Sequence, residues 1–358
     1  MSMIKATMDY SYLNARIRGK KTQLLNNNDF ERLVRATDLD ELSRILNSTA
    51  YSGRLTQRLQ EKPLPGGQEI DKLLTENFLG QYIFLGDFLP TKDKVLLNEI
   101  IKKYYYDSIK YMLRCLHYNQ KIDEFYLVAP RRNDLQILRK LMGATSVSQL
   151  IDMIPDDILR KELHKKLQKY DENRSILILE HELNKFYYKS ILEITNNGKK
   201  ENFKTSMELI GGELDLLNIQ SILRGKLLEF SDEKIRDLVI PYGYYLTGRR
   251  SIDNFISLPT VQAIIAKLEL SPYKDFAESI RKFFEQENEQ QLSEYERLVR
   301  KFLIHRAKKI LIGVPFHLGI FFAYQIYKKT EFENIRSIIL GKLKGMDESL
   351  LKEQIILY

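Results

Sequence analysis

Residues 334–343 have the sequence Asn334-Ile335-Arg336-Ser337-Ile338-Ile339-Leu340-Gly341-Lys342-Leu343, which repeats a stretch 116 residues earlier. The earlier copy is Asn218-Ile219-Gln220-Ser221-Ile222-Leu223-Arg224-Gly225-Lys226-Leu227, and seven of the ten positions are identical. In both copies the apolar residues recur every three or four positions, the period of an amphipathic α-helix. The sequence therefore predicts two copies of one helix.

Two fainter copies occur nearer the N-terminus. One is Tyr12-Leu13-Asn14-Ala15-Arg16-Ile17-Arg18-Gly19-Lys20, which ends on the same Arg-Gly-Lys as the copy at 218–227. The other is Ser108-Ile109-Lys110-Tyr111-Met112-Leu113-Arg114, followed by Cys115-Leu116 in place of Gly-Lys. Internal repeats define the structural unit. We expect three helical sub-domains that share helices, with approximate boundaries at residues 1–112, 113–222 and 223–358.

The repeat extends beyond the long helix. A short helix predicted at 38–46 is followed by Thr49 and Tyr51, and a later short helix is followed by Ser271 and Tyr273 at corresponding positions. Segment 122–130 follows the copy at 108–114 as segment 230–241 follows the copy at 218–227. Each unit is therefore predicted to run long helix, loop, short helix.

Composition favours an all-α fold with more than one sub-domain. The chain has 358 residues, more than a single core usually holds, and only 17 Gly and 9 Pro. The lone cysteine, Cys115, excludes an internal disulfide and is expected to be a small buried side chain. The N-terminus lacks the apolar run of a signal peptide, so we expect a cytoplasmic protein.

Clustered asparagines at 26–28 predict a turn inside an otherwise helical segment 10–35, with Asp29 capping the helix that follows. A second local expectation concerns acidic residues. The stretch 274–312 is predicted to be helical, and its carboxylates are expected on a solvated face; they are Glu285, Glu287, Glu289, Glu294 and Glu296.

The most apolar run of the chain is 310–326. Its length is at the lower limit for crossing a membrane, and Pro315 and His317 interrupt it. A buried helix or helix pair is therefore predicted there, and no membrane span.

No motif for catalysis, cofactor binding or metal binding is present. The Gly225-Lys226 pair lacks the first glycine and the Ser or Thr of a phosphate-binding loop. Glu180-His181-Glu182 lacks the second histidine that a zinc-protease helix needs, because position 185 is lysine. The five histidines have no ligand spacing. We expect no catalytic site, no cofactor and no metal.

Polar and glycine positions in the repeated helices are candidates for helix packing or for contact with a partner. Asn218 and Asn334 directly precede the apolar stripe, where an interior hydrogen bond between helices is favoured over a partner contact. The glycines at 225 and 341 would permit close helix packing or a bend, or would cap the helix C-terminus. The candidates together are Asn14, Arg16, Arg18, Asn218, Arg224, Gly225, Asn334, Arg336 and Gly341.

These stretches, taken in order, resemble one family: the C subunit of archaeal A-type ATP synthases and bacterial V-type ATPases, which is related to the d subunit of the vacuolar enzyme. The resemblance is carried by 10–18, by Thr49-Ala50-Tyr51, by 218–226 and by 331–342. It spans the chain. The middle third departs most, with Cys115-Leu116 in place of Gly-Lys and Met153-Ile154-Pro155-Asp156 where a Thr-x-Tyr ending would stand.

The resemblance implies a fold and a function. The fold would be three similar all-helical sub-domains in a pseudo-threefold funnel. The function would be that of a non-catalytic central-stalk subunit, a socket between the rotating shaft and the membrane proteolipid ring, coupling ATP to H⁺ or Na⁺ transport. The protein would lie on the cytoplasmic face of the membrane, peripherally, with shaft subunits and proteolipid ring as partners and without nucleic acid or a small-molecule substrate.

A different class of function remains as the alternative. The formal net charge of +8 and the 21 tyrosines would also suit a basic helical-repeat protein that binds nucleic acid. An enzyme of unknown chemistry is a third hypothesis, and no constellation of residues supports it.

Overall fold

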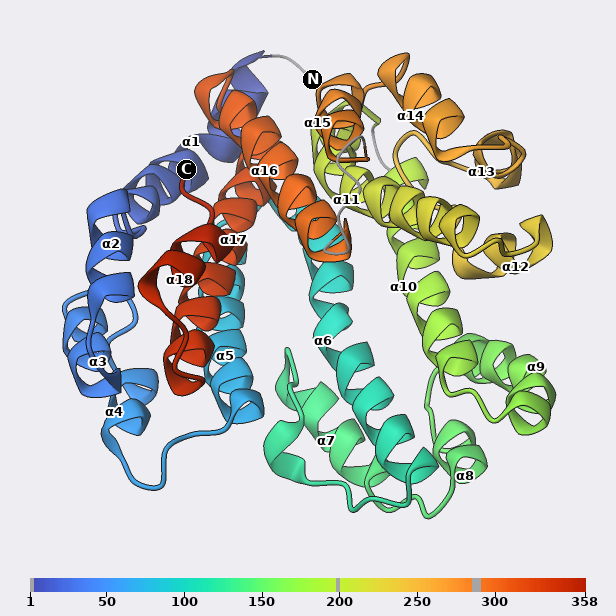
Figure 1. The fold of residues 1–358 in the computed structure, drawn as a ribbon, viewed down its shortest axis with the longest axis horizontal. Helices are drawn as coiled ribbons and strands as arrows, with labels where there is room; N and C mark the ends of the chain where they lie inside the picture. The colour runs from blue at the N-terminus through green and yellow to red at the C-terminus, as the bar shows by residue number, and fades with distance from the viewer. Residues whose placement is uncertain (1–2, 198–199, 285–290) are drawn as a thin grey trace. The chain divides into compact units, whose positions relative to one another are not determined.

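The computed structural model describes residues 3–197, 200–284 and 291–358. In these residues the protein is all-α: it has eighteen α-helices, one short 3-10 helix and no β-strand (Figure 1). The chain divides into two compact units. Unit 1 is Met1–Pro90 together with Gly198–Tyr358, and unit 2 is Thr91–Asn197.

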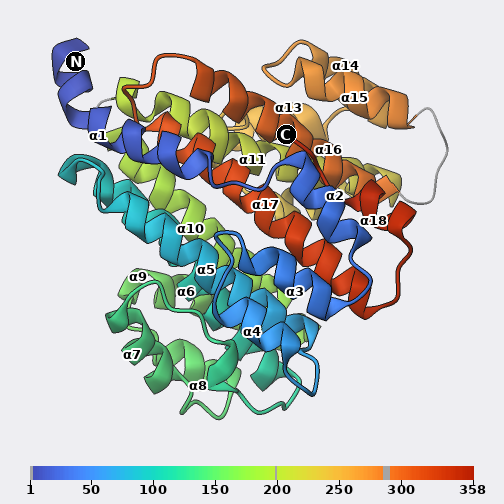
Figure 2. The same ribbon diagram turned by 90° about the vertical axis from the view of Figure 1, so that its left-hand side faces the viewer.

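Unit 1 contains two sets of helices, each with its own apolar core. The first set combines the N-terminal helices with the last two helices of the chain, and the second is continuous in sequence (Figure 2). The first set is α1 (Met3–Lys21), α2 (Asn27–Arg35), α3 (Leu39–Asn47), α4 (Arg54–Gln60), α5 (Gly67–Gly86), α17 (Gly319–Leu343) and α18 (Glu348–Gln354). The second is α11 (Lys200–Leu227), α12 (Asp232–Leu238), α13 (Arg249–Ile256), α14 (Val261–Glu269), α15 (Lys274–Phe284) and α16 (Gln291–Ile312).

The first set has seven helices and the second has six, and two pairs of helices correspond at constant offsets. Helices α12 and α18 are 116 residues apart at both ends, and α3 and α14 are 222 residues apart at both ends. The apolar stripe predicted from the repeat contributes to both cores. Its buried members are Ile219, Ile222 and Leu223 in one core and Ile335, Ile338 and Ile339 in the other. Each core thus contains the apolar stripe of one copy of the repeated helix.

Unit 2 has the same order of elements, a long helix followed by a loop and shorter helices, but different side chains. It runs α6 (Thr91–His117), η1 (Glu124–Tyr126), α7 (Arg132–Leu141), α8 (Val147–Asp152), α9 (Asp157–Asn173) and α10 (Leu177–Asn197). Helix α10 packs against α6 and α9. Cys115 is buried on α6, as predicted. The three-part division at 112 and 222 and the pseudo-threefold funnel both stay predictions.

A break in the helical segment is confirmed, but it lies at residues 22–26, and Asn27 and Asn28 already belong to α2. The predicted cap also needs correction. The N-cap is Asn26 and not Asp29. The Asn26 side chain accepts hydrogen bonds from the backbone N–H groups of Asn28 (2.9 Å) and Asp29 (3.1 Å). The Asp29 carboxylate in turn accepts the N–H of Asn26 (3.0 Å), which completes a capping box. Both side chains therefore stabilise the N-terminus of α2.

The apolar run 310–326 is a helix pair, as predicted, because α16 ends at Ile312 and α17 begins at Gly319. The predicted burial holds only for 318–325, since Ile312 and Val314 are exposed. Among the described helices none is long and apolar enough to cross a membrane. Of the five carboxylates expected on a solvated face, Glu296 is exposed and Glu294 is half-buried. The other three, at 285, 287 and 289, lie outside the described residues.

Candidate functional site

The three longest described helices, α6, α11 and α17, end in the same turn. A residue with positive φ follows each of them: Asn119 (φ 52°), Glu229 (φ 52°) and Gly345 (φ 68°). The next backbone N–H then donates to a carbonyl five residues back, at distances of 2.7, 2.9 and 2.9 Å respectively. This is the Schellman arrangement, which satisfies carbonyls that a helix end would leave free. It turns the chain back along the helix.

A polar side chain inside α11 and α17 binds the returning chain. Asn334 donates from Nδ2 to the carbonyl of Ile356 (2.8 Å) and accepts the N–H of the same residue at Oδ1 (2.9 Å). Asn218 does the same with Ile240, at 2.7 and 2.8 Å. Both asparagines are buried, so water cannot replace these bonds.

Helix α6 uses a smaller side chain for the same purpose. Ser108 donates to the carbonyl of Val128 and accepts its N–H, both at 2.9 Å. We call each of these arrangements, a polar side chain bonded to both backbone groups of one returning residue, a helix-end lock. Locks 1, 2 and 3 are Ser108–Val128, Asn218–Ile240 and Asn334–Ile356.

Glycine allows the returning helix to pack closely in locks 2 and 3. A Cβ added at Gly225 would lie 2.5 Å from Cγ1 of Ile235, and one added at Gly341 would lie closer still to Cδ2 of Leu351. Both apolar residues are fully buried and stand at corresponding places on α12 and α18. The two glycines therefore make room for packing, and the residue with positive φ falls four positions later in the chain.

Two buried carboxylates lie further back along α11 and α17, again 116 residues apart. In the second set, Asp215 accepts the hydroxyl of Tyr273 (2.5 Å) and the N–H groups of Tyr245 (2.6 Å) and Leu246 (3.0 Å). Burial raises the pKa of Asp215 to about 6, although these hydrogen bonds act in the opposite direction. Burial, followed by the nearby carboxylate charge, raises the pKa of the Tyr273 hydroxyl, which therefore remains a donor.

The corresponding carboxylate in the first set joins the two ends of the chain. Glu331 accepts hydrogen bonds from the hydroxyl of Tyr51 (2.8 Å), the N–H of Leu25 (2.5 Å) and Nζ of Lys328 (2.5 Å). The hydroxyl of the last residue, Tyr358, lies 3.4 Å from the same carboxylate. Residues from the N-terminal helices and from the C-terminus therefore contact the same carboxylate, that of Glu331.

Lys328 distinguishes this carboxylate from its counterpart. Its side chain is 1% exposed, and Nζ lies 4.1 Å from the centre of the Tyr51 ring. Burial lowers the pKa of Lys328, and the charge and hydrogen bond of Glu331 oppose that shift. The corresponding position in the second set is Gly212, where an added Cβ would contact the Tyr273 hydroxyl. One set thus buries an ion pair where the other buries a single carboxylate.

The remaining candidates from the sequence are polar residues nearer the helix surfaces. Arg16 is exposed on α1 and donates to the Tyr12 hydroxyl (3.0 Å), and Arg18 donates to Asn14 Oδ1 (3.3 Å). Arg224 is exposed on α11. These side chains are not brought together with the locks.

Arg336 has a different environment from the other arginine candidates. It is half-buried and forms a two-bond ion pair with Asp71 of α5, with an Nη2–Oδ2 distance of 2.9 Å. Bidentate pairing of a guanidinium and a carboxylate fixes both side chains. Arg336 therefore ties α17 to α5.

The sequence patterns do not single out Asp215, Glu331, Lys328 or Ser108 as candidates. A signal for the two acids exists, because they stand at equivalent positions three residues before the repeated asparagines. The tyrosines that bind them also form a corresponding pair in the repeat. The burial that makes these residues important is not visible in one sequence.

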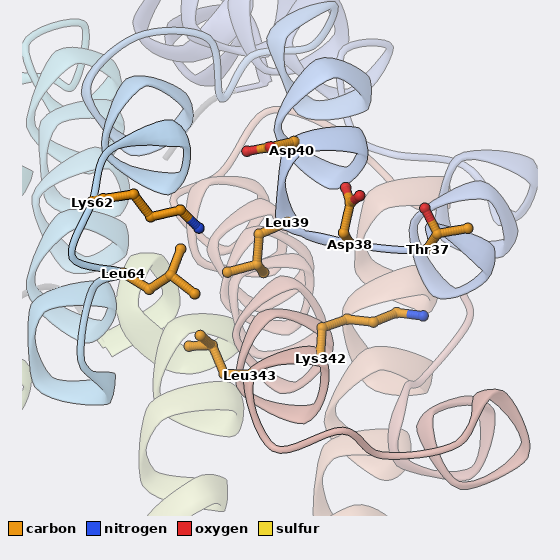
Figure 3. Close-up of a pocket in the computed structure, with 8 residues that line it drawn as sticks. All are labelled: Thr37, Asp38, Leu39, Asp40, Lys62, Leu64, Lys342 and Leu343. Carbon is orange, nitrogen blue, oxygen red and sulfur yellow. The ribbon is translucent and has the colours of Figure 1, made fainter.

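A pocket of about 380 Å³ lies at the C-terminal end of α17 and the beginning of α3 (Figure 3). It is lined by Thr37, Asp38, Leu39, Asp40, Lys62, Leu64, Lys342 and Leu343. The Asp38 carboxylate is used to cap α3, since it accepts the N–H of Glu41 at 2.8 Å. No group of three or more His, Cys, Asp or Glu side chains that could hold a metal occurs in the part of the chain that the structure describes.

Comparison with known proteins gives one consistent result. A family model described as ATP synthase (C/AC39) subunit matches residues 13–354. The C subunit of the A-type ATP synthase of Methanocaldococcus jannaschii is 25% identical over 97% of this chain and 86% of its own length. The corresponding C subunits of Methanosphaera stadtmanae and Pyrococcus abyssi are 27% and 23% identical, over 97% of this chain and 88% and 90% of their own lengths.

Proposed function

The chain belongs to the ATP synthase (C/AC39) subunit family, and from this membership we propose that it is a non-catalytic central-stalk subunit of an A/V-type rotary ATPase. In this role it is a socket that receives the end of the rotating shaft and rests on the membrane proteolipid ring. It links ATP turnover to the transport of H⁺ or Na⁺. Its place is the cytoplasmic face of the membrane, as a peripheral subunit.

The helix-end locks are the structural feature that supports the proposal. A subunit that transmits torque must resist bending, and close packing with satisfied internal hydrogen bonds provides stiffness. In locks 2 and 3 both backbone groups of the returning residue are bound by one buried asparagine. The same device at the end of α6 supports a repeated mechanical role for each of these helices.

The candidate residues divide between stiffness and contact in this proposal. The locks and the close helix packing depend on Asn218, Gly225, Asn334 and Gly341, and Arg336 ties α17 to its neighbour. Three exposed arginines, on α1 and α11, would face partner subunits; they are Arg16, Arg18 and Arg224.

Copurification tests the proposal. A tagged copy of this chain, expressed in the cells it comes from and extracted in mild detergent, is expected to bring down the ATP-hydrolysing subunits and the proteolipid together. A tagged chain that elutes free of both sets under gentle extraction contradicts the proposal. Extraction with a tagged hydrolytic subunit is the matched control, since it shows whether the complex survives the procedure.

A further inference from the structure

The C-terminal part of α16 and the turn that follows combine positive charge with exposed apolar surface. Residues 297–317 contain six Lys or Arg residues and no Asp or Glu. Near the end of this stretch Ile312 and Val314 are 73% and 65% exposed. Figures 1 and 2 show the end of α16 leading through this turn into α17. We call the exposed residues Lys301, His305, Lys308, Lys309, Ile312 and Val314 the α16 tip.

The three arginines of this stretch are paired, Arg297 with Glu294 of the same helix (2.9 Å) and the other two with neighbouring helices, and the lysines are exposed. Arg300 lies 3.2 Å from Glu333, and Arg306 lies 3.1 Å from Glu208. These arginines serve packing between helices. Glu333 of α17 and Glu208 of α11 are therefore already paired.

The lysines of the tip are bound weakly or not at all. Lys309 lies 4.0 Å from Asp275, at the limit of an ion pair. Lys301 and Lys308 are exposed, and neither forms an ion pair with the described residues. The carboxylate whose charge acts on Lys301 is Glu294, which Arg297 already pairs at 2.9 Å. Both ammonium groups can therefore contact an external anion.

The exposed residues also share one face. Positions 301, 305, 308 and 312 are spaced by four, three and four residues, so they form a single line along the helix. The line runs from positive charge to an exposed isoleucine, and exposed Val314 follows it in the turn. Apolar side chains beside lysines are the arrangement with which proteins bind the boundary of an anionic lipid bilayer.

We propose that the α16 tip binds an anionic lipid surface, with Ile312 and Val314 inserted among the headgroups and with Lys301 and Lys308 contacting phosphates. Charge complementarity favours lipid phosphate, because the stretch has no acid of its own and its two unpaired lysines lie on the line that leads to the apolar end. The inference goes beyond the proposed function, since it concerns the chain alone and does not require the shaft or the ring.

The chain contains no tryptophan, so one introduced at the tip is a unique fluorescent reporter. The full-length Ile312→Trp variant is mixed with vesicles of phosphatidylcholine, with or without phosphatidylglycerol. We expect its emission to shift to the blue with the anionic vesicles only. As salt is raised, the emission should return to the wavelength seen without vesicles. Ile158→Trp is the matched control, because Ile158 is 64% exposed on α9 and does not lie on this basic line. No shift is expected for it.

Substitution of the charges provides the second arm. In the Ile312→Trp background, Lys301→Gln with Lys308→Gln is expected to weaken partitioning about fivefold per lysine removed. Lys121→Gln with Lys161→Gln, which changes two exposed lysines elsewhere, should leave partitioning unchanged.

Three results would overturn the proposal. The first is an equal shift for the Ile312→Trp and Ile158→Trp variants, and the second is equal binding of Ile312→Trp to neutral vesicles. The third is a tryptophan at position 312 whose emission does not change with vesicles but shifts to the blue in the purified ATPase. That result would assign the α16 tip to a protein partner. None of these outcomes bears on copurification, so the two proposals fail separately.

Discussion

Replacement of Asn334 by alanine tests the helix-end lock most simply. The change removes the hydrogen bonds of 2.8 and 2.9 Å to the carbonyl and N–H of Ile356. Both residues are at most 2% exposed, so water cannot satisfy the two groups. Each buried backbone group left without a partner costs about 1–3 kcal/mol. We therefore expect the free energy of unfolding of unit 1 to fall by about 2–6 kcal/mol.

Two further variants make the result specific. Asn334→Ser should lose less than Asn334→Ala, because Ser108 forms the same pair of bonds in lock 1. Ser337→Ala, three residues away in the same helix and half-buried, should change stability by less than about 0.5 kcal/mol.

Urea denaturation followed by circular dichroism gives the global value, and hydrogen exchange of peptide 344–358 gives the local one. We expect faster exchange of this peptide in Asn334→Ala and not in Ser337→Ala. A loss below about 1 kcal/mol, together with unchanged exchange, would refute the inference that the asparagine holds the returning chain.

Three further predictions concern the other buried positions. Gly341→Ala should destabilise the protein by about 1–3 kcal/mol in urea denaturation, because the new Cβ overlaps the packed side chain of Leu351; an unchanged midpoint would show that the helix moves aside at no cost. The pKa of Asp215 is raised in the folded state to about 6, so the folded protein retains a proton that the unfolded chain releases, and stability falls as pH rises from about 4 to 6. Relative to Asp215→Asn, the wild type should lose about 2–2.5 kcal/mol between pH 4 and pH 7, whereas parallel pH profiles would contradict a buried, titrating carboxylate. Lys328→Met leaves a buried carboxylate without its cation and should cost about 3–5 kcal/mol by urea denaturation, and a variant as stable as the wild type would show that the tyrosine and backbone donors suffice.

The helices and their repeat can be predicted because they depend on local patterns. The stripe at Ile335, Ile338 and Ile339 has helical spacing, and the same stripe forms part of a core. The sequence predicts the cap of α2 three residues late, because both Asn26 and Asp29 are good capping residues and the structure uses them together. Local chemistry therefore identifies the element and its approximate start.

The buried network is less accessible to prediction. Glu331, Tyr51 and Leu25 come from sequence positions up to 306 residues apart, and nothing local marks them as neighbours. Ser108 aligns with the repeated asparagines, but its different side chain conceals the shared role, since a hydroxyl can both donate and accept as a carboxamide does. Side chains that satisfy distant backbone groups need the fold before they can be recognised.

The most direct test of the proposed role is a coupling measurement on membrane vesicles from cells that lack this chain. We expect the soluble part of the ATPase still to hydrolyse ATP, while ATP-driven ion uptake into the vesicles is lost and returns when the wild-type chain is supplied. Ion uptake that persists without the chain, or hydrolysis that disappears with it, would contradict a non-catalytic subunit that links the shaft to the membrane ring.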